Sequence, residues 1–304
     1  MFSNFFEIFL LISPVFILII LGNILRRVGV PDVSFWDVND KLVYWVLIPA
    51  LLFHEIAQIN LTISMLYAYG AVILGGLAVV TIVSIFFGKF LGYSPEIWTS
   101  MLQGAARHNA FIALAIAGSL FGNEGLAIGA VFMLLYVPSI NIVVISIMVA
   151  SLNQPGKNSS QKSIINIFIE LTKNPFILAM IAGLLVSLFP LERMSVLIDT
   201  TELLGSAALP IMLLTIGAKI KVRDLTLQIT PIIISNLLKL VILPVTVYFV
   251  AVYLDLSKTE IIVAVIFSAV PTATMSYTFA KQFGADDKLM RGILTTQIVL
   301  SFLY

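Results

Sequence analysis

Residues 96–122 read EIWTSMLQGAARHNAFIALAIAGSLFG, an apolar run that polar residues interrupt halfway. Residues 260–284 read EIIVAVIFSAVPTATMSYTFAKQFG, with a comparable interruption and the same Phe-Gly ending. A membrane tolerates irregular backbone only where protein or a cavity surrounds it, so the matched interruptions at 104–110 and 268–274 predict a binding site within the bilayer. The alternative interpretation is a pair of kinked but continuous helices, since prolines are common in membrane spans.

The composition requires a lipid environment for most of the surface. Of the 304 residues, 60% are hydrophobic and 11% are charged, against about 25% charged in an ordinary soluble domain, and the mean hydropathy is +1.08. A net charge of +1 with dispersed basic residues excludes a nucleic-acid partner. The chain has no cysteine, and its two histidines, His54 and His108, lie too far apart for a local metal motif. We therefore expect an integral membrane protein without metal or cofactor.

Apolar runs of membrane-spanning length predict ten helices. They cover residues 6–25, 41–58, 65–91, 97–121, 125–150, 164–189, 195–219, 228–254, 259–282 and 289–304. The longest candidate linker, 151–163, is polar and rich in Pro, Gly and Ser, and it divides the chain into repeats at 1–150 and 164–304. The last span is short for a bilayer, so either the helix itself is short or the sequence lacks a native tail.

Basic residues fall almost entirely on one side of the predicted topology. Two of them, Arg193 and Lys258, follow even-numbered spans. The loops and span ends on the other side hold Arg26, Arg27, Lys41, Lys89, Lys157, Lys162, Lys219, Lys221, Arg223, Lys281, Lys288 and Arg291. The positive-inside rule then places both termini outside and the 151–163 linker in the cytoplasm.

The second half of the chain repeats the first in the opposite membrane orientation. Residues 42–59 align with 203–220, which matches Pro49 to Pro210, and the interrupted fourth spans align as quoted above. Five spans per half make such a repeat inverted. We expect an all-α integral membrane fold, a five-plus-five inverted repeat in which broken helices four and nine cross. Pro49 and Pro210 are interpreted as kinks.

Segments along nearly the whole chain resemble the auxin efflux carrier family, whose members include plant auxin exporters and bacterial permeases annotated for malate or malonate. They are SPVFILIILGNILRRVGV (13–30), IPALLF (48–53), RHNAFIALAIAGSLFGNEGLAIGAVFMLLYVPSINIVVIS (107–146), NPF (174–176), ALPIMLLTIGAKI (208–220), LLKLVILP (237–244) and VPTATMSYTFAKQFGADD (270–287). Plant members often carry Asn-Pro-Asn at the fourth-span crossover, where this chain has Arg107-His108-Asn109.

This resemblance implies a fold like that of the bile acid:sodium symporters, in which an elevator motion carries the site across the membrane. Helices 1, 2, 6 and 7 would form a scaffold and a homodimer surface, and helices 3–5 and 8–10 a moving domain. A multi-pass carrier of a small organic anion in the inner membrane, not an enzyme, is the leading expectation. The first alternative is a proton- or sodium-coupled carrier of another small solute. A membrane-embedded enzyme or a sensor ranks below it.

The candidate substrate-binding residues lie at the interruptions and in the neighbouring spans: Arg107, His108, Asn109, Asn141, Lys239, Pro271, Thr272 and Thr274. An ionised side chain in a membrane span needs a reason. Arg107 is interpreted as a substrate contact or an ion-pair partner. Lys239 shares a helix face with Ser235 and Asn236. It has three interpretations: it neutralises the C-termini of the broken helices, it faces an anionic substrate, or its ammonium group snorkels to the membrane surface.

Outside the interruptions, His54 and Glu55 lie in the outer third of the second span. Glu55 is a candidate for ion coupling, with His54 beside it; the plainer interpretation is an interfacial carboxylate that reaches headgroups or water. For His108 a proton relay and a packing histidine stay open, and for Asn141 a cavity-facing amide and a helix–helix hydrogen bond. The spacing of Gly118 with Gly122, and of Gly125 with Gly129, predicts close helix packing.

Overall fold

A computed structural model describes residues 5–152, 172–190, 194–219 and 228–301. The predicted linker at 151–163 lies almost entirely outside the described residues, as does the start of the predicted sixth span. All regular elements in the described ranges are helical. Five helical stretches in these ranges are long and apolar enough to cross a membrane; they cover Phe6–Val28, Ile63–Phe90, Pro95–Ser151, Ser195–Lys219 and Ile229–Tyr253, and the third includes an interruption described below.

The chain divides into two compact units, each of which draws helices from both halves of the sequence. Unit 1 comprises Met1–Leu61, Phe111–Leu134 and Thr172–Ile220, and unit 2 comprises Thr62–Ala110, Leu135–Leu171 and Lys221–Tyr304. The scaffold and moving-domain roles stay predictions, and so does the inverted repeat.

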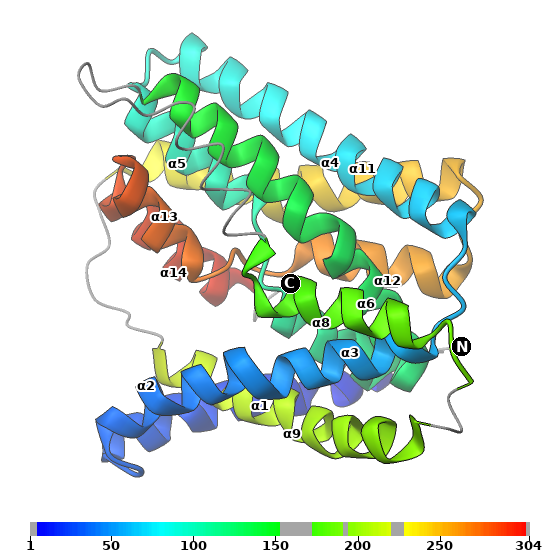
Figure 1. The fold of residues 1–304 in the computed structure, drawn as a ribbon. Helices are drawn as coiled ribbons and strands as arrows, with labels where there is room; N and C mark the ends of the chain where they lie inside the picture. Colours follow the sequence, from blue (N-terminus) through cyan, green and yellow to red (C-terminus); the bar gives the residue numbers. More distant parts are fainter. Residues whose placement is uncertain (1–4, 153–171, 191–193, 220–227, 302–304) are drawn as a thin grey trace. The chain divides into compact units, whose positions relative to one another are not determined.

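Unit 1 is built on α1 (Phe5–Val28), α2 (Val33–Leu42), α3 (Ile48–Gln58), α8 (Pro175–Val186) and α9 (Ser195–Lys219). In Figure 1, α1 runs beside α9, and α3 packs against both α8 and α9. Glycine permits the α1–α9 approach. A Cβ added to Gly217 would lie 1.8 Å from the carbonyl oxygen of Ile19, and one added to Gly22 would lie 2.0 Å from that of Leu214.

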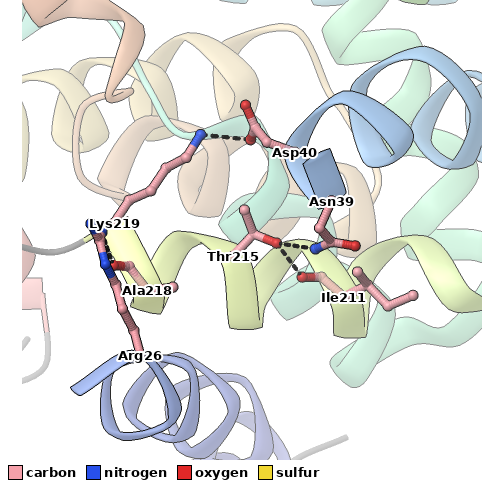
Figure 2. A network of polar contacts seen from close by, with 7 residues as sticks. All are labelled: Arg26, Asn39, Asp40, Ile211, Thr215, Ala218 and Lys219. Carbon is pink, nitrogen blue, oxygen red and sulfur yellow. Dashed lines mark hydrogen bonds and ion pairs between the residues drawn. The ribbon is translucent and has the colours of Figure 1, made fainter. Parts of the chain in front are cut away.

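Polar contacts in unit 1 satisfy carbonyl groups in the last turn of α9, which would otherwise lack intrahelical donors. The Arg26 guanidinium donates to the carbonyl of Ala218 at 2.5 Å, and the Asn23 side-chain amide donates to that of Gly217 at 3.0 Å. Lys219 forms an ion pair with Asp40 at 2.7 Å (Figure 2).

One further hydrogen bond in this network ties α2 to α9. The Asn39 amide donates to the Thr215 hydroxyl at 2.7 Å, and this hydroxyl donates in turn to the carbonyl of Ile211 at 2.9 Å (Figure 2). Both Asn39 and Thr215 are buried. The ends of α2 and α9 are therefore held by specific polar contacts as well as by apolar packing.

Unit 2 contains α4 (Ile63–Phe90), α5 (Pro95–Ala106), α10 (Ile229–Leu237), α11 (Leu243–Tyr253), α12 (Lys258–Ala269), α13 (Met275–Phe283) and α14 (Asp287–Ser301). Local signals fix several ends: Thr62 caps α4, Ser257 and Glu260 form a capping box on α12, and Gly284 ends α13 at φ 79°. In Figure 1, α4 runs beside α11.

Helix α6 (Ala110–Ser151) joins the predicted fourth and fifth spans, and Gly122 interrupts it with φ 58°. A Cβ added to Gly125 would lie 2.2 Å from the carbonyl oxygen of Ala117, so the arms on either side of Gly122 pack closely. The packing prediction is therefore confirmed for Gly125. Gly122 instead supplies the turn, since L side chains rarely adopt its positive φ.

Two helices widen into a π turn just before a proline. Residues Val43–Leu47 (η1) precede Pro49, and Leu238–Ile242 (η3) precede Pro244. In each, the residue after the π segment donates five positions back, from Ile48 to Val43 and from Leu243 to Leu238. Proline lacks a donor of its own, and the widened turn accommodates it while the helix continues. Pro210 lies inside continuous α9.

Candidate functional site

Both interrupted sequences are breaks in helical structure within unit 2. Helix α5 ends at Ala106, Arg107 turns to extended backbone (φ −71°, ψ 153°), and α6 begins at Ala110. Helix α12 ends at Ala269, Val270 is extended (φ −62°, ψ 153°), and α13 begins at Met275. The continuous-helix alternative is therefore wrong at both positions.

The two breaks touch through their backbones. The N–H of Asn109 donates to the carbonyl of Pro271 at 2.8 Å. Asn109, Pro271 and Thr272 are all buried, so each peptide group released from a helix needs such a partner. The contact joins the Arg107–Asn109 segment to the Val270–Thr274 segment.

Gln297 of α14 bridges the same two breaks. Its Oε1 accepts from the N–H of Thr272 at 2.9 Å, and its Nε2 donates to the carbonyl of Gly104 at 3.0 Å. The side chain is 0% exposed. Sequence reasoning missed this residue, although an amide side chain within a predicted membrane span is a signal that could have found it.

Close packing around Gly104 brings α5 against its neighbours at the bridge. A Cβ on Gly104 would lie 2.5 Å from the Ser235 hydroxyl oxygen and 2.6 Å from Ile293. The Ser235 hydroxyl donates to the carbonyl of Met101 at 3.1 Å. The carbonyl of Gly104 is itself one of the groups released at the end of α5, and the Gln297 side chain satisfies it.

The Tyr136 hydroxyl, from α6, donates to the carbonyl of Ala106 in the last turn of α5. The Tyr136 ring lies edge-on to His108, with 4.0 Å between ring centroids, and Phe267 packs on His108 at 5.5 Å. His108 is thus surrounded by aromatic rings, and its Nδ1 is buried without a hydrogen-bond partner among the described residues. Tyr136 is a second site residue that sequence reasoning missed.

Arg107 lies at the first break and is 6% exposed. One terminal nitrogen donates to the Asn141 side-chain oxygen at 3.1 Å, and the guanidinium carbon lies 4.3 Å from the centre of the Phe279 ring. Its Nε and other terminal nitrogen have no hydrogen-bond partner within the described ranges. No acidic residue described by the structure forms an ion pair with it. Asn141 accepts from an extended segment and not from another helix, so both interpretations of Asn141 stay predictions.

Lys239 lies in the π segment η3 and is 0% exposed. Its ammonium nitrogen is buried, and among the described residues it has no hydrogen-bond partner. Arg107 and Lys239 both lie close enough to His108 to act on it electrostatically. Ser235 and Asn236, which share a helix face with Lys239, are buried as well, so this face points into the protein. Two buried cations therefore belong to the region of the breaks, and the full burial of Lys239 excludes snorkelling.

Three further polar residues lie at or near the breaks: the predicted residues Thr272 and Thr274, and Gln103, which was not predicted. The Thr272 hydroxyl lies 3.1 Å from that of Ser276. Thr274 precedes α13, and its side chain does not cap that helix. Gln103, 0% exposed, has no hydrogen-bond partner in the described structure for either amide atom. Unsatisfied buried polar atoms of this kind cluster where a ligand or water completes the bonding.

His54 and Glu55 belong to α3 of unit 1 and are 8% and 7% exposed. Both residues line a pocket whose described residues all belong to unit 1. In the described part of the chain, no three His, Cys, Asp or Glu residues are placed to hold a metal ion.

The chain belongs to a family of membrane transport proteins, the auxin efflux carrier family, whose model matches residues 7–304. This match confirms the resemblance seen in the sequence and identifies a multi-pass membrane protein of a transporter family. A search of curated proteins finds no match.

Proposed function

We propose that this transporter carries a small organic anion, a carboxylate, which binds at the two helix breaks of unit 2. The observation that carries the proposal is the pair of buried cations, Arg107 and Lys239, whose nitrogens include three without partners in the described structure. None of the buried polar residues described in unit 2 is Asp or Glu. Buried charge is costly unless it is paired, so a bound anion is the missing counterion.

The chemistry of the two cations suits a carboxylate. The planar guanidinium of Arg107 offers a fork of donors that matches two carboxylate oxygens, and its free Nε and terminal nitrogen lie on adjacent donor positions of that fork. The Phe279 ring beneath the guanidinium limits its orientations. Lys239 supplies a second, more flexible positive charge.

The transport cycle we propose follows the family: an elevator motion in a homodimer of the inner membrane, with both termini outside and the 151–163 linker in the cytoplasm. Without a nucleotide-driven step, the driving force is a gradient or the membrane potential. A potential that is negative inside expels anions, which favours efflux. The broken helices support this cycle because such interruptions of membrane helices form the binding sites of secondary transporters.

Counterflow in proteoliposomes tests the site. Asn109→Ala and Lys239→Ala should each abolish counterflow of a dicarboxylate such as malonate while the purified protein stays folded. Lys258→Gln is the matched control, because Lys258 is an exposed lysine in unit 2 and its loss should leave counterflow unchanged. Wild-type counterflow in both site variants would place the binding site elsewhere.

A second candidate is a proton- or sodium-coupled carrier. The observation in its favour is the buried carboxylate of Glu55 in unit 1. In that case, transport by Glu55→Gln would lose its dependence on the cation gradient but keep counterflow. Loss of counterflow together with gradient dependence would reject the coupling role.

A further inference from the structure

Unit 1 contains a pocket that the proposed anion site does not use. Its volume is about 410 Å³, and four segments line it: α1, α3, the part of α6 around Gly122, and α9. All of these lining residues belong to unit 1. Most of the wall is apolar, with Leu51 and Leu213 among the contributors. Volume and lining are those of a small-molecule site.

Two carboxylates supply the charge of this pocket. Glu55 on α3 is 7% exposed, whereas Glu202 on α9 is exposed, so one acid lies inside and one lies at the rim. They are close enough to repel each other. Glu55 accepts no hydrogen bond and forms no ion pair with any described residue.

No basic side chain offsets these acids. None of the residues that line the pocket is Lys or Arg. His54 is already engaged: its Nδ1 lies 3.2 Å from the carbonyl of Ile198, and the Gln58 amide nitrogen lies 2.6 Å from its Nε2. A carbonyl accepts a hydrogen bond and an amide N–H donates one, so in this arrangement Nδ1 donates and Nε2 accepts, and both ring nitrogens have partners. The pocket therefore presents uncompensated negative charge.

The size of the pocket and its small number of oxygen ligands favour an organic cation over a bare metal ion. A metal ion needs several oxygen ligands at short, nearly equal distances, and the described residues provide no cluster of three acidic or imidazole ligands here. An ammonium group with an apolar body instead matches both features, because its charge pairs with Glu55 while its hydrocarbon covers the leucine wall. We propose that this pocket binds a small organic ammonium ion, with Glu55 as its principal counterion and Glu202 at the entrance.

Binding to the purified full-length protein in detergent tests this site independently of transport. The probe is benzylammonium chloride, measured by calorimetry and by thermal shift, with benzyl alcohol and sodium chloride as size-matched neutral and small-cation comparisons. Benzylammonium should bind and raise the unfolding temperature, and the two comparison compounds should not. Equal stabilisation by benzyl alcohol would reject the charge argument, and stabilisation by sodium chloride alone would replace the organic ligand with an alkali cation.

Three carboxylate variants locate the charge. Glu55→Gln should weaken benzylammonium binding by on the order of 30-fold or more, because it removes a buried counterion. Glu202→Gln should weaken it by about 2- to 5-fold, since that residue is exposed. Glu124→Gln, an exposed acid of the same unit that does not line the pocket, should leave it unchanged. Unaltered binding by Glu55→Gln would overturn the proposal.

A labelling experiment on the unmodified protein covers the case in which Glu55→Gln fails to fold. Buried carboxyl groups add to a hydrophobic carbodiimide and form a stable N-acylurea, and mass spectrometry identifies the modified peptide. Benzylammonium should protect Glu55 from labelling, and benzyl alcohol should not. Labelling of Glu55 that proceeds equally with and without benzylammonium would contradict binding at this pocket. Neither result depends on the anion site, so the two proposals fail separately.

Discussion

The backbone N–H of Asn109 donates a 2.8 Å hydrogen bond to the carbonyl oxygen of Pro271. The two residues lie in the breaks of different helices, so each break supplies a partner that the other lacks. A single direct bond does not satisfy every released group, and Gln297 satisfies two more, the N–H of Thr272 and the carbonyl of Gly104. The breaks are therefore stable structural features that leave selected side-chain donors unpaired.

Removing the amide of Gln297 should destabilise unit 2. In Gln297→Leu, the N–H of Thr272 and the carbonyl of Gly104 lose their partners in a buried site, at a cost of about 1–3 kcal/mol each. Thermal unfolding in detergent measures the change. Ser301→Ala on the same helix is the control: its hydroxyl bonds only a carbonyl of its own helix, and its loss should change stability by less than about 0.5 kcal/mol. Equal stability of both variants would contradict the bridging role.

Transport of an anion without a compensating ion moves charge. Substrate currents in proteoliposomes should reverse sign when the imposed membrane potential reverses, since each charge gains about 2.3 kcal/mol per 100 mV. Electrophysiology on a solid-supported membrane measures them. Electroneutral uptake at every potential would favour the proton- or sodium-coupled candidate over uncoupled efflux.

Alanine at the α1–α9 contact should separate these helices. In Gly217→Ala the new Cβ would lie 1.8 Å from the backbone oxygen of Ile19, an overlap that backbone movement must relieve at a cost of about 3 kcal/mol, the upper end of the usual range for overpacking. Gly70→Ala provides the comparison, because nothing lies within 4 Å of its added Cβ, and it should stay within about 1 kcal/mol of wild type. Unfolding in detergent distinguishes the two, and a tolerated Gly217→Ala would show that α1 and α9 pack less closely.

Two adjacent polar residues at the end of α2 should differ in their effect on stability. The Asp40–Lys219 ion pair has side chains 36% and 35% exposed, so Asp40→Asn should cost less than about 1 kcal/mol. Asn39→Leu breaks a buried 2.7 Å bond to the Thr215 hydroxyl, and the loss should reach about 1–3 kcal/mol. Added salt should shrink only the Asp40 effect. The reverse ranking in a thermal-unfolding series would show that the ion pair dominates this corner.

Local sequence was sufficient to locate the two breaks. Arg107-His108-Asn109 and Pro271 lie within otherwise apolar runs, and such residues end a membrane helix through their own polarity or missing donor. The membrane environment and the transporter family likewise followed from composition and ordered motifs, and the family match confirms the latter. Arg107, Asn109 and Lys239 were also recognisable as candidate site residues, since polar and charged side chains are rare in membrane spans.

The sequence by itself determined where helices start, stop and break, because the alternation of apolar and polar residues acts on near neighbours. Only the tertiary structure decided which residues distant in the sequence lie together. Gln297 reaches Thr272 across 25 residues and Gly104 across 193, and Glu202 on α9 joins Glu55 on α3 at one pocket. Long-range pairs of this kind depend on which helix faces pack together, and hydropathy does not specify that choice because many facings bury similar apolar area.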